Sequence, residues 1–253
     1  MLFRSGKAAA LSLSREGARV AVAARDQGRL DDAVSEISSQ TENPVIGVST
    51  DVRDESSVAA LIARVTDEWG GLDILVNNAG TSSTSRLEDM TNEKMTADIE
   101  LKVYGAVYGT RHALPFLKQS DSAVIINTTT PGGKAPTAGT QPTALSRAAG
   151  ISLTKTWSKE FAEFNIRVNT ICPGMIETPL NRGVWQAWND RQPEEEKQDY
   201  HEWAAGKIGN VVPLGRWQQP EDVADMAVFL SSKRSHNVTG QTINVDGGFI
   251  MHS

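Results

Sequence analysis

The chain has 253 residues, of which 39% are hydrophobic and 22% are charged, and its formal net charge at pH 7 is −6. This length and composition predict one soluble globular domain, residues 1–253, and exclude a disordered or fibrous chain. The acidic balance argues against partners such as nucleic acid, and no apolar run is long enough to span a membrane. The only cysteine, Cys172, cannot form an internal disulfide, so we expect a reducing, cytoplasmic environment.

Short apolar runs alternate with amphipathic stretches along the whole chain. The predicted strands are 19–24, 45–50, 72–77, 123–127, 167–171 and 242–245, and the predicted helices include 8–16, 58–69, 101–117, 148–164 and 220–230. The strands are continuously apolar, as expected for a parallel sheet that is covered on both faces. The pattern therefore predicts an α/β fold, a Rossmann-like doubly wound parallel sheet. Residues 181–211 are the only long stretch predicted to be irregular.

Four short segments lie at or near the ends of predicted strands. They are Asp51-Val52, Asn77-Asn78-Ala79-Gly80, the stretch 167–174 followed by Thr178, and the stretch 239–248. Ligands of doubly wound sheets bind at the carboxyl ends of strands, where small residues let a flat ligand approach the backbone. Each segment alone could be an ordinary turn. In this order they resemble the short-chain dehydrogenase/reductase family over nearly the whole chain.

The resemblance implies an NAD(P)-dependent oxidoreductase that transfers a hydride to or from a small-molecule carbonyl or alcohol, assembled as a homotetramer or homodimer. By the same resemblance, the adenine would be contacted by Asp51 and Val52. The central cofactor channel would be lined by Asn78, Ala79 and Gly80, and the nicotinamide would lie beside Pro173, Gly174 and Thr178. Residues 181–211 would form a lid. Trp185 and Trp188 within it suit an apolar or aromatic substrate, or they serve only for packing.

The residue after the first predicted strand bears on cofactor preference. A carboxylate there would bind the ribose diol of NAD and repel a 2′-phosphate. This chain has Arg25, whose guanidinium can pair with that phosphate. The position favours NADP(H) over NAD(H), although Asp26 weakens the indication and an unengaged surface arginine is the alternative.

The family's opening strand and Gly-rich turn have no complete counterpart. That turn places a pyrophosphate at a helix N-terminus, and only Gly6 corresponds to its last glycine. We therefore expect a sheet that lacks its central strand, with residues 1–5 non-native. The alternative is a native irregular arm over the same five residues.

The catalytic positions that the resemblance implies are all substituted. The family uses a Tyr, a Lys four residues later, a Ser thirteen residues before the Tyr, and an Asn on an earlier helix. Here these positions hold Thr143, Arg147, Thr130 and Lys102. An aliphatic hydroxyl is too weak an acid for proton exchange near neutral pH, so conventional tyrosine catalysis is predicted to be lost. Lys102 is the candidate proton donor because a desolvated lysine can titrate near neutrality, and an exposed helix lysine is the alternative.

Two other functions stay open at this stage. In one, the fold binds a nucleotide or small molecule without hydride transfer, and Thr130, Thr143 and Arg147 form an anion-binding patch. In the other, the chain is similar to the halohydrin dehalogenases, which also carry Arg in place of the Lys but need the tyrosine that this chain lacks. No spacing of His or Cys with acidic residues predicts a metal site.

Overall fold

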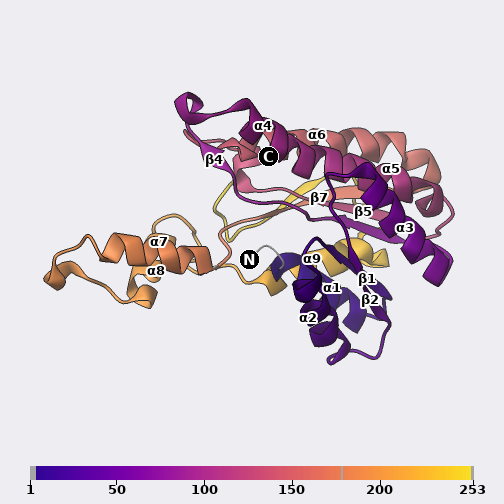
Figure 1. The fold of residues 1–253 in the computed structure, drawn as a ribbon, viewed down its shortest axis with the longest axis horizontal. Coiled ribbons are helices and arrows are strands. Elements are labelled where there is room, and N and C mark those ends of the chain that lie inside the picture. Colours follow the sequence, from indigo (N-terminus) through magenta and orange to yellow (C-terminus); the bar gives the residue numbers. More distant parts are fainter. Residues whose placement is uncertain (1–3, 178, 252–253) are drawn as a thin grey trace.

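The computed structural model describes residues 4–177 and 179–251 (Figure 1). The strands are β1 (Val20–Ala24), β2 (Val45–Ser49), β3 (Ile74–Asn77), β4 (Thr84–Ser85), β5 (Val124–Thr128), β6 (Gln141–Pro142), β7 (Arg167–Pro173) and β8 (Thr242–Val245). The helices are α1 (Arg4–Arg15), α2 (Gln27–Ser38), α3 (Glu55–Trp69), α4 (Asn92–Ile99), α5 (Gly105–Leu117), α6 (Thr143–Glu160), α7 (Pro179–Asn189), α8 (Tyr200–Gly209) and α9 (Pro220–Ser231). A π-helical turn, Glu100–Tyr104, joins α4 to α5.

Helices cover both faces of the parallel strands, as the sequence predicts (Figure 1). Along β5 the side chains alternate between the two cores. Val124 and Ile126 pack in the cluster with α1 and α9, whereas Ile125 packs in the cluster with α3, α5 and α6. All three are fully buried, which explains the continuous apolar run that identified this strand. The doubly wound α/β fold is confirmed.

The parallel strands form two separate sheets. β1 pairs with β2, and the second sheet has the order β3-β5-β7-β8. Within the described residues, no strand pairs with the remaining edge of β1 or of β3, which agrees with the expected lack of a central strand. Arg4 and Ser5 begin α1, so the expectation of an irregular arm is wrong for these two residues, and residues 1–3 lie outside the described part.

Local signals account for most element boundaries. Asp54 caps α3 by accepting a hydrogen bond from the backbone N–H of Ser56, and Gly70, with φ of 79°, ends the same helix. By contrast, α6 begins five residues earlier than predicted. Its first residue, Thr143, is fixed to another part of the chain, since its Oγ1 accepts from Ser83 N at 3.0 Å and donates to Ser83 O at 2.7 Å. A tertiary contact of this kind leaves no local sequence pattern.

The prediction that residues 181–211 are irregular is wrong. This stretch contains most of α7 and all of α8, which project from the body as an arm (Figure 1). Aromatic rings hold the two helices together: Trp185 meets Tyr200 edge-on at 5.8 Å, and Trp188 lies 6.3 Å from Trp203, both between ring centroids. The surrounding Glu and Gln residues hid this apolar seam from the sequence pattern. Trp185 and Trp188 thus pack within the arm.

A buried polar network joins the strand ends on which the site is built. Asn77 Nδ2 donates to Asn127 Oδ1 at 2.9 Å, and Asn127 Nδ2 donates to Thr154 Oγ1 at 2.8 Å. The Thr154 hydroxyl also lies 2.6 Å from that of Thr170. The network connects β3, β5, α6 and β7. It fixes the strand register next to the loops that carry the functional residues.

Replacing Asn127 with alanine should lower the free energy of unfolding by about 2–3 kcal/mol, because it removes partners of the buried Asn77 and Thr154 side chains. Urea unfolding followed by circular dichroism measures the change. The exposed residue Ser122 provides the control, and Ser122→Ala should stay within about 0.5 kcal/mol of the parent. Equal losses in the two variants would contradict a stabilising network.

No described helix combines the length and apolar character that crossing a bilayer requires.

Candidate active site

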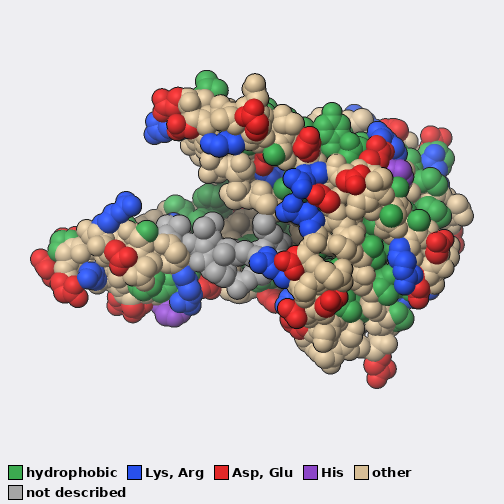
Figure 2. Space-filling model, in the orientation of Figure 1, with side chains coloured by type: hydrophobic (Ala, Val, Ile, Leu, Met, Phe, Trp, Pro, Cys, Tyr) green, Lys and Arg blue, Asp and Glu red, His purple; other side chains and the backbone are tan. Residues whose placement is uncertain are grey.

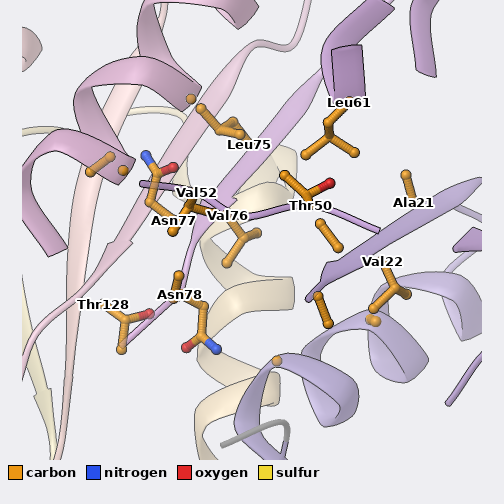
Figure 3. A pocket seen from close by; sticks show the side chains of 18 of the residues that line it. Ala21, Val22, Thr50, Val52, Leu61, Leu75, Val76, Asn77, Asn78 and Thr128 are labelled. Carbon is orange, nitrogen blue, oxygen red and sulfur yellow. The ribbon is translucent and has the colours of Figure 1, made fainter. Parts of the chain in front are cut away.

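A cavity of about 920 Å³ lies between β1 and β3 and continues past their carboxyl ends. Figure 3 shows Ala21 and Val22 of β1 on one side of it and Leu75, Val76 and Asn77 of β3 across from them. Asn78 and Thr128 lie at one end. The walls between the strands are apolar, whereas charged and amide side chains gather where the strands end.

Most of the predicted cofactor-binding residues meet in this cavity. Those that line it are Gly6, Arg25, Asp51, Val52, Asn78, Ala79 and Gly80. They come from four separate elements or loops: the start of α1 and the segments that follow β1, β2 and β3, which meet at the carboxyl ends of these strands. Gly6 lets α1 approach closely, since an added Cβ would lie 2.9 Å from Asn78 Nδ2.

Arg25 follows β1 directly and lies on the cavity wall. The neighbouring carboxylate, Asp26, is occupied elsewhere. Its Oδ1 accepts from the backbone N–H of Arg29 at 3.0 Å and caps α2, and its Oδ2 lies 3.7 Å from Arg29 Nε. Asp26 therefore does not neutralise Arg25, and the guanidinium can engage an anion.

Asp51, after β2, is held as a carboxylate. It accepts hydrogen bonds from Arg53 Nε at 3.0 Å and from Arg53 Nη2 at 2.5 Å. These bonds keep the pKa of the Asp51 carboxyl below its ordinary value. Val52 beside it packs against the start of α5, where an added Cβ on Gly105 would lie 3.0 Å from Val52 Cγ2.

Lys102 is buried in the π-helical turn and lines the cavity. Its ammonium donates to Thr143 Oγ1 at 2.8 Å and to Asp98 Oδ1 at 2.5 Å. Burial lowers the pKa of Lys102 from its ordinary value of 10.5. The hydrogen bond that Lys102 donates to Asp98 opposes this shift, and the charge of Arg147 adds to it. The alternative of an exposed helix lysine is wrong, because only 5% of the residue is accessible.

Arg147, one turn into α6, is a buried cation. It is 9% exposed, its Nη1 donates to Thr128 O at 2.6 Å, and its Nε has no partner within the described chain. Burial lowers its pKa to about 10. The guanidinium lies against Gly80 so closely that an added Cβ there would overlap Nη2. Gly80 thus makes room for Arg147 at the cavity wall.

Four predicted residues do not line this cavity. Thr143 reaches it only through its bond to Lys102, and Thr130 makes no hydrogen bond to Lys102, Thr143 or Arg147 in the described structure. Pro173 ends β7, and Gly174 packs at the end of β8. There its N–H donates to Val245 O at 3.0 Å, and an added Cβ would lie 2.6 Å from Asp246 Cβ. Thr178 lies outside the described residues.

Sequence reasoning missed Asp98. This residue is 3% exposed, lies one helical turn before Lys102, and forms an ion pair with it in which both side chains are buried. An acidic residue four positions before a lysine is a recognisable helix pairing. The signal was therefore available, but it carries weight only once Lys102 is known to be buried.

The residues present fit a phosphorylated dinucleotide. The guanidinium of Arg25, which makes no hydrogen bond within the described chain although the Asp51 carboxylate attracts it, and the unpartnered Arg147 Nε are donors along one continuous cavity. Gly6 allows a close approach to the backbone. In the described part of the chain, no group of His, Cys, Asp or Glu residues could hold a metal ion. Figure 2 shows a hollow between the α7–α8 arm and the body, with Lys and Arg side chains on the body's side of it.

Fold and site together define a dinucleotide-binding protein of the doubly wound class. A sequence model described as enoyl-(acyl carrier protein) reductase matches residues 5–250. A 3-oxoacyl-[acyl-carrier-protein] reductase of Thermotoga maritima is 34% identical over 246 residues, covering 97% of this chain and 93% of that protein. The chain belongs to the short-chain dehydrogenase/reductase family.

Solved structures are similar over the whole chain. L-sorbose reductase from Gluconobacter frateurii, complexed with NADPH and L-sorbose, has a TM-score of 0.92 at 30% identity and covers 99% of this chain and 94% of that one. A short-chain oxidoreductase from Pseudomonas aeruginosa PAO1, with NADPH bound and an atypical catalytic center, has a TM-score of 0.90 at 30% identity with the same coverage.

Proposed function

We propose that this protein is an NADP(H)-dependent oxidoreductase that reduces a small carbonyl compound or oxidises the corresponding alcohol, with Lys102 in place of the family's tyrosine as the proton donor. The observation that carries the proposal is the position of Lys102. Its ammonium is buried, yet it lines the same cavity as Arg25, Asn78 and Gly80.

The proposed division of roles follows from the side chains. When bound, NADPH supplies the hydride that goes to the carbonyl carbon. Lys102 donates a proton to the carbonyl oxygen and becomes a neutral amine, a step that burial favours because it lowers the pKa of the lysine. Thr143 accepts a hydrogen bond from Lys102 and holds its Nζ on the α6 side. Arg147 supplies a fixed positive charge beside Gly80.

The test measures binding and turnover separately. NADPH and NADH binding is measured by calorimetry on the full chain, and NADPH oxidation is then followed with aliphatic and aromatic ketones, aldehydes and 3-oxoacyl thioesters. Binding of NADPH together with turnover of any carbonyl supports the proposal. Binding without turnover favours a nucleotide-binding protein of the same fold, and halide-dependent chemistry without nucleotide binding favours a lyase.

Arg25→Ala should weaken NADPH binding about 10–100-fold and leave NADH binding within a factor of two, because a charged hydrogen bond to the 2′-phosphate is lost. Calorimetry on both cofactors measures the effect. Arg64→Ala is the control, since Arg64 pairs with Glu68 on the outside of α3 and does not line the cavity. Equal weakening of NADPH and NADH by Arg25→Ala would contradict the phosphate contact.

Four finer features belong to the same proposal. The α7–α8 arm acts as a lid, and the substrate is apolar or aromatic. The protein functions in the cytoplasm, where the unpaired, buried Cys172 stays reduced. It assembles as a homotetramer or homodimer, which light scattering after size-exclusion chromatography tests directly.

A further inference from the structure

Lys102 is held by a carboxylate that does not reach the cavity. Asp98 Oδ1 accepts from Lys102 Nζ at 2.5 Å, and the exposed fractions of the two side chains are 1% and 0%. Asp98 itself is absent from the cavity wall, whereas Lys102 is part of it. Asp98 therefore affects a ligand in the cavity through other residues: through the lysine that it binds directly and, by charge alone, through Arg147.

The backbone between the two residues directs the lysine toward the cavity. Asp98 is in the last turn of α4, and Lys102 is in the π-helical turn that follows, where Gly105 N donates to Glu100 O five residues back. A π turn inserts one residue into the helix and changes the direction of the side chains after it. In Figure 1 this part of the chain lies next to α6, which supplies Thr143.

One N–H group of the Lys102 ammonium has no hydrogen-bond acceptor in the described structure. A lysine ammonium has three N–H groups. One is directed at Asp98 Oδ1 and one at Thr143 Oγ1, and the third has no acceptor among the residues that the structure describes. Because Lys102 lines the cavity, this third N–H is the one available to a ligand there.

Stability alone does not explain the pair. Two apolar side chains of similar size would fill the same space as well or better, since a buried ion pair loses its hydration. Here the loss is greater because Asp98 Oδ2 is buried without any partner in the described chain. Two charged side chains of the described structure act on the Lys102 ammonium: Asp98 in α4 stabilises its charge, and Arg147 in α6 opposes it.

We propose that Asp98 is a positioning residue that keeps Lys102 protonated next to the cation Arg147 and directs its third N–H into the cavity. This inference rests on the proposed role of Lys102 in proton transfer. The opposing charges make a definite prediction. Removing the carboxylate leaves two buried cations together, so Lys102 should give up its proton at lower pH.

The test follows the titration of Lys102 directly. The protein is labelled with ¹³C,¹⁵N-lysine, and the Cε and Nζ signals are recorded against pH. The Lys102 signal is identified by its absence in Lys102→Met. In Asp98→Asn the titration midpoint should fall by about one pH unit or more. The matched control is Glu100→Gln, which removes a carboxylate two residues away that has no hydrogen bond to Lys102 in the described structure, and its midpoint should not move.

A kinetic measurement gives an independent readout. In Asp98→Asn the rate of carbonyl reduction should start to fall at a correspondingly lower pH, whereas Asp98→Glu, which keeps the carboxylate, should restore much of the parent profile. If Asp98→Asn does not fold, the Lys102 titration midpoint is compared between the double variant Asp98→Asn/Arg147→Met and the single variant Arg147→Met. The double variant should fold because Lys102 is then its only cation at this site.

The possible outcomes separate this inference from the proposed function. An unchanged Lys102 midpoint in Asp98→Asn would overturn the role of Asp98, whatever the enzyme's activity. A lowered midpoint in a protein that turns over no carbonyl would confirm that Asp98 controls the charge of Lys102 and would refute proton donation as the purpose of that control.

Discussion

Lys102→Met is expected to reduce the kcat for carbonyl reduction by about 10²–10⁴-fold, the range typical of losing a general acid. Methionine keeps the length of the side chain and removes its proton. Thr143 cannot replace the lysine, since its hydroxyl is already directed at Ser83 O at 2.7 Å and is a very weak acid. Stopped-flow measurement of NADPH oxidation at saturating cofactor separates this loss from any change in binding.

Two further variants exclude a folding defect. Lys102→Met leaves Asp98 buried as an unpaired carboxylate, which costs about 3–5 kcal/mol of stability. Adding Asp98→Asn removes that charge, so the double variant should fold and stay inactive. Lys94→Met changes an exposed lysine on α4 and should retain full activity. In the described chain, Lys94 Nζ donates a hydrogen bond only to Asp89 O. Activity near the parent level in the double variant would exclude Lys102 as the acid.

The role of Lys102 as proton donor also determines how the activity of the unmodified protein depends on pH. Lys102 must be protonated for reduction, and its burial lowers its pKa below 10.5. The reduction rate should therefore fall as pH rises through a value below 10.5, and the rate of alcohol oxidation, which needs the neutral amine, should rise over the same range. Initial rates in both directions between pH 6 and 10.5 measure this. Parallel profiles for the two directions would be inconsistent with proton transfer by Lys102.

The cofactor end of the site was predictable because its residues follow strands. Arg25, Asp51 and Asn78 each come shortly after a buried run, and parallel strands place such residues at one edge. Periodicity and turn residues are local signals, and they located the ends of these strands along the chain. The same signals could not show that Gly174 packs on Asp246, since that contact depends on where β8 pairs.

The catalytic end could be predicted only in part. By the family resemblance, Lys102 stands at the position of the family's Asn and Thr143 at the position of its Tyr. In the structure Lys102 Nζ donates a hydrogen bond to Thr143 Oγ1 at 2.8 Å. The pairing of Lys102 with Asp98 was missed, because the polar sequence of α4 looks like a solvated helix and the π turn that buries both residues has no sequence signature. The α7–α8 arm was missed for a similar reason, since its apolar seam lies between polar faces.

Arg147→Met should stabilise the protein while impairing the site. Burial lowers the pKa of Arg147 to about 10, which corresponds to a destabilisation of about 3 kcal/mol from holding the cation in the interior. Methionine fills a similar volume without that charge, although Thr128 O loses its donor. We expect the free energy of unfolding at pH 7 to rise by about 1–3 kcal/mol, measured by urea denaturation.

The sign of this effect can be checked against pH. Because burial lowers the pKa of Arg147, the folded state carries its full penalty at every pH below about 10 and is relieved only above it. The gain in Arg147→Met should therefore not change with pH below about 10, except where Lys102, whose pKa the charge of Arg147 lowers, gives up its proton. Arg167→Met is the control, since Arg167 is also partly buried but bonds Ser235 Oγ at 2.8 Å away from the cavity. It should lose stability.

The functional loss in Arg147→Met should appear in binding and in the charge of Lys102. NADPH affinity is expected to fall about 10–100-fold, because the cation beside Gly80 and its unpaired Nε no longer meet the ligand. The pKa of Lys102 should rise, since the charge of Arg147 lowers it in the parent, so reduction should persist to higher pH, the reverse of Asp98→Asn. A stabilised variant with unchanged NADPH affinity would show that Arg147 does not contact the cofactor.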